Sequence, residues 1–207
     1  MAISFPLDFP TETGISDIVF HMDNARAISR SPFTGRQQVY KWPLQKWSVD
    51  ITLPTMQRDR AEAWIVFLAK LNSGVSTDLP TFYLSDPNAQ PLGSQATNFL
   101  VNSGGDPNTV NLSDLDTGKV GALLPGDYIR IGTGSSSRLH KVLDQVDSNG
   151  VGEGSAAIWP ANYQSLNDTE GSNLDAYGVF LLTDNRSSFS INNNSSYGIT
   201  FTAESLV

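Results

Sequence analysis

The feature that most constrains this fold is an alternation of apolar and polar residues, which recurs in short stretches along the chain. Residues 47–53 show it most clearly, because every second side chain is large and apolar: Trp47, Val49, Ile51 and Leu53. A period of two is typical of a strand that buries one face. Residues 55–71 have a helical period instead, with Thr55 as candidate N-cap and a predicted buried stripe of Ala61, Trp64, Ile65, Leu68 and Leu71.

Further short strands are predicted where apolar and β-branched residues lie between turn-forming ones. They cover residues 15–29, 38–42, 80–85, 128–131, 138–146, 151–158, 177–182, 189–191 and 197–201. Pro32 and Gly35 favour a turn at 31–35. Residues 88–120 are predicted to be a loop-rich segment, and 161–173 a polar linker. This pattern predicts a mainly β fold, a sandwich or barrel with one packed α-helix.

Composition places the chain among soluble globular proteins. It has 207 residues, 39% of them hydrophobic, which allows one large domain or two small ones with cores. The absence of Cys excludes disulfides, thiolate metal sites and a Cys nucleophile. No apolar run approaches the roughly 20 residues of a membrane helix. The first residues lack the basic and apolar regions of a signal peptide. We therefore expect synthesis in a cytoplasm and no membrane insertion.

The charge of the chain is negative and unevenly distributed. The net charge of −8 argues against binding to a nucleic-acid backbone, since such binding needs a basic patch. Residues 1–88 carry eight Lys/Arg and nine Asp/Glu, whereas residues 89–207 carry five and twelve. This shift predicts two regions in different settings.

Residues that carry chemistry form no recognisable motif. The two histidines, His21 and His140, lie far apart in the sequence. The Gly-rich run 132–135 lacks the Lys and the following helix of a phosphate-binding loop. Residues 147–153 resemble part of a calcium loop but supply too few ligands, and their Asn-Gly pair favours a hairpin. We expect no catalytic residue, no metal and no cofactor.

Several segments resemble, in order, segments of the distal tail proteins of siphophages, which are long-tailed bacteriophages. The first are SPFTGRQQVYKWP (31–43) and WSVDITLP (47–54), followed by the helix that contains AEAW. PGDYI (125–129), RLHKV (138–142) and IWP (158–160) resemble a barrel-type insertion, and GVFLL (178–182) and YGITF (197–201) resemble the closing strands. The polar stretch 93–120 departs from the family pattern.

The resemblance implies a two-part architecture and a structural role. Residues 1–88 and 168–207 would form a discontinuous β-sandwich belt domain, and residues 89–167 an inserted β-barrel-like domain. A homo-hexameric ring at the tail tip would connect the tail tube protein to the tail hub and the other tail-tip proteins. DNA would pass through the lumen without specific binding. The protein would be part of the virion, assembled in the bacterial host cytoplasm.

Under this hypothesis the protein is not an enzyme, and its important surfaces are contacts between subunits. We expect Arg36, Lys41 and Trp42 to contribute to these contacts, because charged residues alternate with apolar ones in this segment. An acidic lumen would let DNA slide without adhering to the wall.

Two other functions stay open from the sequence. A carbohydrate-binding module would use residues 89–167, with Trp159 as candidate glycan contact, since an aromatic ring can form a platform for a sugar. A glycan-degrading enzyme would use two carboxylates, and the candidates are Asp114, Asp116, Asp127 and Asp144, with Asp127 and Asp144 the ones to test first. Spacing does not single out such a pair, and a solvated acidic face is the simpler interpretation.

Overall fold

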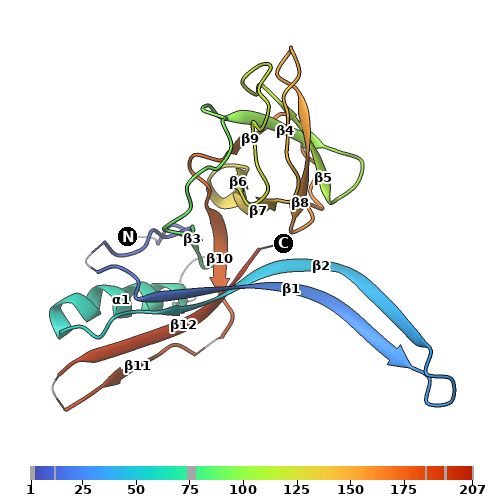
Figure 1. Cartoon of the computed structure of the whole chain (residues 1–207). Coiled ribbons are helices and arrows are strands. Elements are labelled where there is room, and N and C mark those ends of the chain that lie inside the picture. The colour runs from blue at the N-terminus through green and yellow to red at the C-terminus, as the bar shows by residue number, and fades with distance from the viewer. Residues whose placement is uncertain (1–2, 12, 74–77, 185, 194, 207) are drawn as a thin grey trace.

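The computed structural model describes residues 3–11, 13–73, 78–184, 186–193 and 195–206. Over these residues the chain is mainly β, with one α-helix and a closed six-stranded barrel, which confirms the expected fold class at this level. Figure 1 shows a sheet packed beside the helix, the barrel next to this sheet, and a long two-stranded arm that projects from it.

The chain forms part of the sheet, then the barrel, and then the rest of the sheet. The elements before the barrel are the strands β1 (Asp17–Arg30) and β2 (Gln37–Thr52), the helix α1 (Arg58–Leu71) and the strand β3 (Thr81–Leu84). The barrel contains β4 (Phe99–Ser103), β5 (Thr109–Ser113), β6 (Tyr128–Ile131), the 3-10 helix Gly134–Ser136, β7 (Arg138–Val142), β8 (Gly154–Trp159) and β9 (Thr169–Ser172). The closing strands are β10 (Gly178–Leu182), β11 (Ser188–Ile191) and β12 (Tyr197–Ser205).

The sheet joins segments from the two ends of the sequence. Its strand order is β1-β2-β12-β10-β3, and β11 pairs with the first half of β12. β2 and β12 are antiparallel neighbours, so Ile51 lies opposite Phe201. Chain segments before and after the barrel therefore share one sheet. The predicted boundary between residues 167 and 168 falls just before β9, which pairs with β4 and β6 inside the barrel.

The main core lies between this sheet and α1. The predicted alternation on β2 is confirmed, since Trp47, Val49 and Ile51 are buried while the residues between them face outward. The predicted helical stripe is buried except for Ile65, which is half-buried, and Phe67 joins it. Aromatic rings fill the space between helix and sheet, and Phe67 and Phe82 meet edge to face at 5.7 Å. Such pairs stabilise a core beyond the area they bury.

The helix begins later than the sequence predicts. α1 starts at Arg58, its N-cap position is Gln57, and no side chain caps it, so the prediction of Thr55 as the cap was wrong. The reason is that Met56 exchanges two backbone hydrogen bonds with Tyr197, of 3.1 and 2.8 Å. This bridge holds the chain extended through Met56 and delays the first helical turn.

The barrel has its own core. Its strands follow one another in the order β4-β5-β8-β7-β6-β9 and close on themselves, so every strand has two neighbours. The core contains Phe99, Val101, Val110, Leu112, Leu115, Leu123, Ile129, Ile131, Val142, Val146, Ala156, Ile158 and Leu166. β9 approaches this core closely, because a Cβ on Gly171 would lie only 2.5 Å from the Phe99 ring.

Two barrel segments were predicted as loop or linker, and both predictions were wrong. Residues 88–120 contain β4 and β5, and residues 161–173 contain β9. β4 and β5 do alternate, with Phe99 and Val101 inward on one and Val110 and Leu112 inward on the other. The runs are only five residues long and lie between polar turns, which hides the period. β9 (TEGS) has no apolar pattern, and its strand pairing comes from β4 and β6.

Candidate functional site: the projecting arm and the barrel junction

The arm, defined as residues 24–45, is a hairpin that continues β1 and β2 beyond the sheet. Asn24 pairs with Gln45 at its base. At its tip the Ser31 N–H donates to the Arg36 carbonyl oxygen at 2.9 Å, and the Gly35 N–H donates to the Ser31 carbonyl oxygen at 3.0 Å. Gly35 has φ +66°, a backbone conformation that glycine adopts without steric cost. The predicted turn at 31–35 is therefore confirmed.

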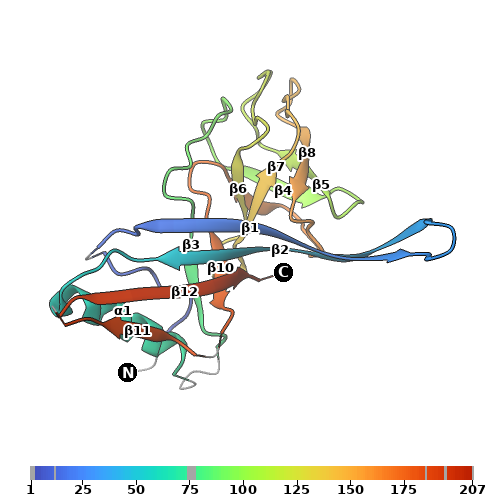
Figure 2. The ribbon, with the colours of Figure 1, turned by 60° about the horizontal axis from the view of Figure 1, so that its bottom comes forward.

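A bulge divides the arm near its base. Asn24 lies opposite Gln45 and Arg26 lies opposite Lys41, so residues 42–44 on β2 face the single residue Ala25 on β1. Pro43 fits this position because it has no N–H to offer to a ladder. Bulges bend a strand and increase its twist, and Figures 1 and 2 show the arm curving as it leaves the sheet. The two strand pieces predicted here are therefore one strand with a bulge.

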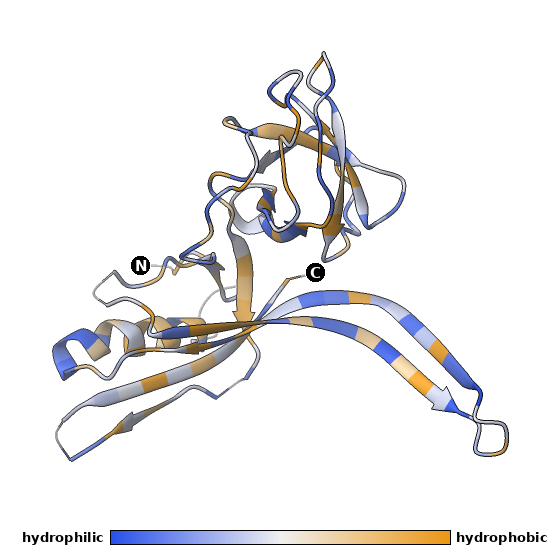
Figure 3. Cartoon of the chain, viewed as in Figure 1, coloured by the Kyte–Doolittle hydropathy of each residue, from blue (hydrophilic) through white to orange (hydrophobic). Residues whose placement is uncertain are grey.

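The arm has no core. None of its residues is buried, and its large apolar side chains are open to solvent, including Trp42 at 53% and Phe33 at 96% exposure. Figure 3 shows apolar and polar residues mixed along both strands. A two-stranded hairpin alone is marginally stable in water. Apolar side chains gathered on an exposed element indicate an interaction surface.

The structure places all three predicted contact residues on this arm. Trp42 lies in the bulge, Lys41 pairs across the ladder with Arg26, and Arg36 follows the tip. Sequence reasoning missed Arg26 and Arg30, which lie on the opposite strand. The available signal was the absence of any Asp or Glu from residue 24 to residue 49.

The base of the arm is fixed to the barrel by Trp47. This residue is 1% exposed, and its indole N–H donates to the Leu139 carbonyl oxygen of β7 at 2.9 Å. Its ring meets Trp159 of β8 edge to face at 4.5 Å. The candidate glycan contact Trp159 therefore lies half-buried in the junction between barrel and sheet, in contact with Trp47. The Ala161 N–H adds a bond of 2.8 Å to the Gln45 side chain.

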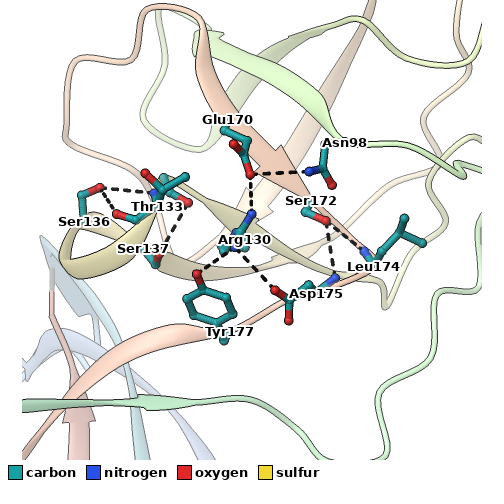
Figure 4. Close-up of polar contacts among 11 residues, drawn as sticks. Asn98, Arg130, Thr133, Ser136, Ser137, Glu170, Ser172, Leu174, Asp175 and Tyr177 are labelled. Atoms are coloured by element: carbon teal, nitrogen blue, oxygen red, sulfur yellow. Dashed lines mark hydrogen bonds and ion pairs between the residues drawn. The ribbon is translucent and has the colours of Figure 1, made fainter. Parts of the chain in front are cut away.

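A buried arginine joins the barrel to the segment that returns to the sheet (Figure 4). Arg130 of β6 is 7% exposed and donates to Glu170 of β9 at 2.6 Å and to the Tyr177 hydroxyl at 2.8 Å. Asp175 lies 3.6 Å from the same guanidinium. The guanidinium carbon of Arg130 also lies 4.8 Å from the centre of the Tyr177 ring. Together with the Trp47 contacts, this cluster holds the barrel at a defined place on the sheet.

The two histidines lie in separate places and share no site. His140 is buried in the barrel with Nδ1 2.8 Å from the Pro160 carbonyl oxygen, and its Nε2 has no partner in the described part of the chain. Burial lowers the pKa of His140 to about 4, so the ring is neutral at pH 7. His21 is exposed on β1, 3.0 Å from Asp50.

The candidate carboxylates have different environments. Asp127 is 2% exposed and accepts the N–H groups of Leu92, Gly93 and Leu124 at 2.6, 3.0 and 2.8 Å. It therefore holds the chain entering the barrel against the β6 turn. Asp144 is exposed on the connection after β7. A carboxylate that already accepts three backbone N–H bonds is poorly placed to act as a nucleophile or acid.

The loops that resembled ligand sites use their oxygens internally. Asp147 accepts the Gly121 N–H at 2.7 Å, and the Asn149 side chain accepts the N–H groups of Val151 and Glu153. In residues 132–135, Thr133 starts a capping box that closes on Ser136. Among the described residues, no three His, Cys, Asp or Glu side chains are grouped as a metal site would need.

Comparisons with known proteins add no family. Within the part of the chain that is described, no helix is long and apolar enough to cross a membrane. No family model matches the sequence, and the curated proteins contain no match to it. Function must therefore be inferred from the arm, the junction and the barrel surface.

Proposed function

We propose that this chain is a structural subunit of a bacteriophage tail tip. In this proposal a hexameric ring connects the tail tube to the hub and adsorption apparatus and lets DNA pass through its centre. Several sequence segments resemble segments of siphophage distal tail proteins in the same order along the chain, and this resemblance supports the proposal. The observation that carries it is the arm, a projecting hairpin with no buried residue and with exposed apolar side chains along its length.

The geometry of the arm favours contacts that close a ring. Residues 24–30 of β1, at about 3.3 Å per residue, reach roughly 23 Å beyond the sheet. The arm points away from the barrel and from α1 in both views (Figures 1 and 2). In the proposed ring, the arm contacts a surface of the neighbour other than the neighbour's own arm. Such head-to-tail contacts produce a ring when the rotation between neighbours closes.

The same proposal includes the belt as a β-sandwich. The ring centroids of Phe82 of β3 and Phe201 of β12 lie 6.3 Å apart on the core face, although β10 separates their strands. In the proposed sandwich the β3–β10 end of the sheet folds toward the β2–β12 end over this aromatic layer. Each belt would then present a compact wedge to its neighbours, with the arm crossing the boundary between them.

One sheet face suits a surface along which DNA slides. Opposite α1, Asp50 faces His21, Asp23 accepts the Ser48 hydroxyl, and Glu204 pairs with Lys46. These strands therefore expose carboxylates and small polar groups rather than free cations. We propose that this face lines the lumen, because like charge prevents a polyanion from adhering.

The test is to remove the arm and measure assembly. In the arm-shortened variant, an Asn-Gly turn replaces residues 25–44 and joins Asn24 to Gln45, since this pair of residues favours a tight hairpin. Sedimentation velocity and negative-stain microscopy of the wild-type chain should show a hexamer and closed rings. The variant should be a monomer that still unfolds in one cooperative transition. A wild-type chain that stays monomeric at every attainable concentration, or a variant that forms the same rings, would contradict the proposal.

A further inference from the structure

The arm carries a charge opposite to that of the rest of the chain. It contains Arg26, Arg30, Arg36 and Lys41 and no Asp or Glu, so its formal charge is +4. The remaining residues carry nine Lys/Arg and all twenty-one Asp/Glu, a net charge of −12. All four arm cations are exposed, and none forms an ion pair with any residue that the structure describes.

The ladder register gathers three of these four cations on one face of the arm. Arg26 lies directly opposite Lys41, Ile28 opposite Val39, and Arg30 opposite Gln37. Opposed residues at alternate positions share a face. This face therefore has an apolar centre flanked by three cations. Like charges directly opposite each other destabilise a hairpin, so the pair of Arg26 and Lys41 favours an anionic partner surface.

The barrel exposes the complementary charge. Residues 99–172 carry four Lys/Arg and nine Asp/Glu. Three of the four cations are already engaged: Arg130 in its buried cluster, Arg138 with backbone carbonyls, and Lys141 over the Tyr128 ring at 4.2 Å. Lys119 is the one barrel cation with no such partner among the described residues.

Two neighbouring barrel connections hold most of the carboxylates. Residues 114–127 and 143–153 are joined by the Leu123–Val146 bridge and by the Gly118 N–H, which donates to the Asn149 carbonyl oxygen at 3.0 Å. Asp114, Asp144, Asp147 and Glu153 on these connections are exposed, and Asp116 is half-buried. The Gly121 N–H lowers the pKa of Asp147, which keeps this group charged.

We propose that the basic face of the arm docks on these two acidic connections, 114–127 and 143–153, of a second copy of this chain. This inference rests on the proposed ring and names the surface that the arm occupies. The tip of the arm does not contact these two connections of its own chain, because it points away from them (Figures 1 and 2). Charge complementarity of this kind orients partners and accelerates their encounter.

The test is a charge swap in the full chain. Arg26→Glu with Arg30→Glu reverses the arm, and Asp144→Lys with Glu153→Lys reverses the barrel surface. Each double variant should weaken self-association at least about tenfold by sedimentation, since truncated or reversed interface charges are costly. The chain that carries all four changes should recover ring formation.

Asp17→Lys with Asp59→Lys is the matched control. Both residues are exposed outside the arm and the barrel, and assembly should be unchanged.

Other outcomes separate this inference from the proposed function. If the arm-shortened variant is monomeric while both charge reversals leave assembly intact, the ring proposal stands and the barrel is not the partner. If arm reversal weakens assembly but barrel reversal does not, the docking surface lies elsewhere on the copy. A labelled DNA duplex that binds the wild-type arm, and not the arm-reversed variant, would show that the arm serves a nucleic acid and would overturn the inference.

Discussion

The barrel and the arm are both built from antiparallel strands, yet they bury their side chains to opposite degrees. Each barrel strand pairs on both edges, and inward residues such as Ile129 and Ile158 are fully buried. Each arm strand pairs on one edge beyond the bulge, and Ile28 and Val39 remain about half exposed although they face each other. Similar β-branched residues therefore form a core in one region and an open surface in the other. Closure of the sheet makes the difference.

This contrast separates residues that fold the chain from residues that are free to serve an assembly. Trp47 and Trp42 show it within one strand, because the first is 1% exposed at the junction and the second is 53% exposed in the bulge. Substitutions at the junction and in the barrel should therefore lower the free energy of unfolding strongly, and substitutions on the arm only slightly.

Trp47→Ala should lower the free energy of unfolding by about 3–5 kcal/mol, because it leaves a cavity and removes the bond to Leu139. Trp42→Ala should change it by no more than about 0.5 kcal/mol, as for other exposed sites. Urea denaturation of dilute, monomeric protein measures both. Equal losses in the two variants would show that the arm contributes to the monomer core.

Stability should fall as pH is lowered toward 4 because of His140. Its folded pKa is about 4 and its ordinary value is 6.5, so the unfolded chain binds more protons between these values. The stability that depends on the neutral His140 ring is fully present above pH 6.5 and is lost as the pH falls through this window. Its complete loss lowers the free energy of unfolding by about 3 kcal/mol.

His140→Gln removes this titration and should flatten the pH dependence in urea denaturation. Protonation of carboxylates with a lowered pKa, such as Asp106 and Asp147, also reduces the stability of the protein in acid, but it does so equally in wild type and variant. The difference between wild type and variant therefore isolates His140. Identical slopes between pH 7 and pH 4.5 would contradict a buried neutral ring.

Asp127→Asn should lower the free energy of unfolding by about 1–3 kcal/mol, because an amide cannot accept all three backbone N–H groups. Asp144→Asn is the matched control on the exposed connection, with an expected change within about 0.5 kcal/mol. Thermal unfolding compares them. Loss of a glycan-degrading turnover in both variants, without loss of stability, would instead favour the enzyme hypothesis.

The arm-shortened variant should have the smallest effect on the monomer. Removing residues 25–44 takes away no buried side chain, so the free energy of unfolding should change by about 0.5 kcal/mol or less. The comparison is made by denaturation at a concentration where the wild type is also monomeric. A loss similar to that of Trp47→Ala would mean that the arm packs on its own chain.

The sequence predicts the parts of the fold in which periodicity is strong. The alternation at 47–53 and the helical stripe of α1 lie where expected. β4, β5 and β9 were missed, because their runs are short or, in TEGS, have no apolar period. Strands of that kind are defined by their barrel neighbours, and local sequence does not contain that information.

The candidate site was predicted only in part, for a related reason. The segment with Arg36, Lys41 and Trp42 was identified, but its projection from the sheet depends on where β12 stops pairing with β2, at Ser48. Trp159 looked available for a glycan because nothing local shows that Trp47 packs against it. The charge division was present in the sequence, and it becomes visible when residues 24–45 are counted as one unit.

Hydrogen exchange followed by mass spectrometry reports on the arm and the barrel in one sample, and so shows whether the arm becomes ordered only in the assembly. In dilute protein, amides of residues 24–45 should exchange rapidly while those of β6 and β8 are protected, since the arm has no core. At concentrations where rings form, the arm amides should become protected and the barrel strands should change little. Arm amides that exchange equally fast in monomer and ring would show that the arm does not form the contact between subunits.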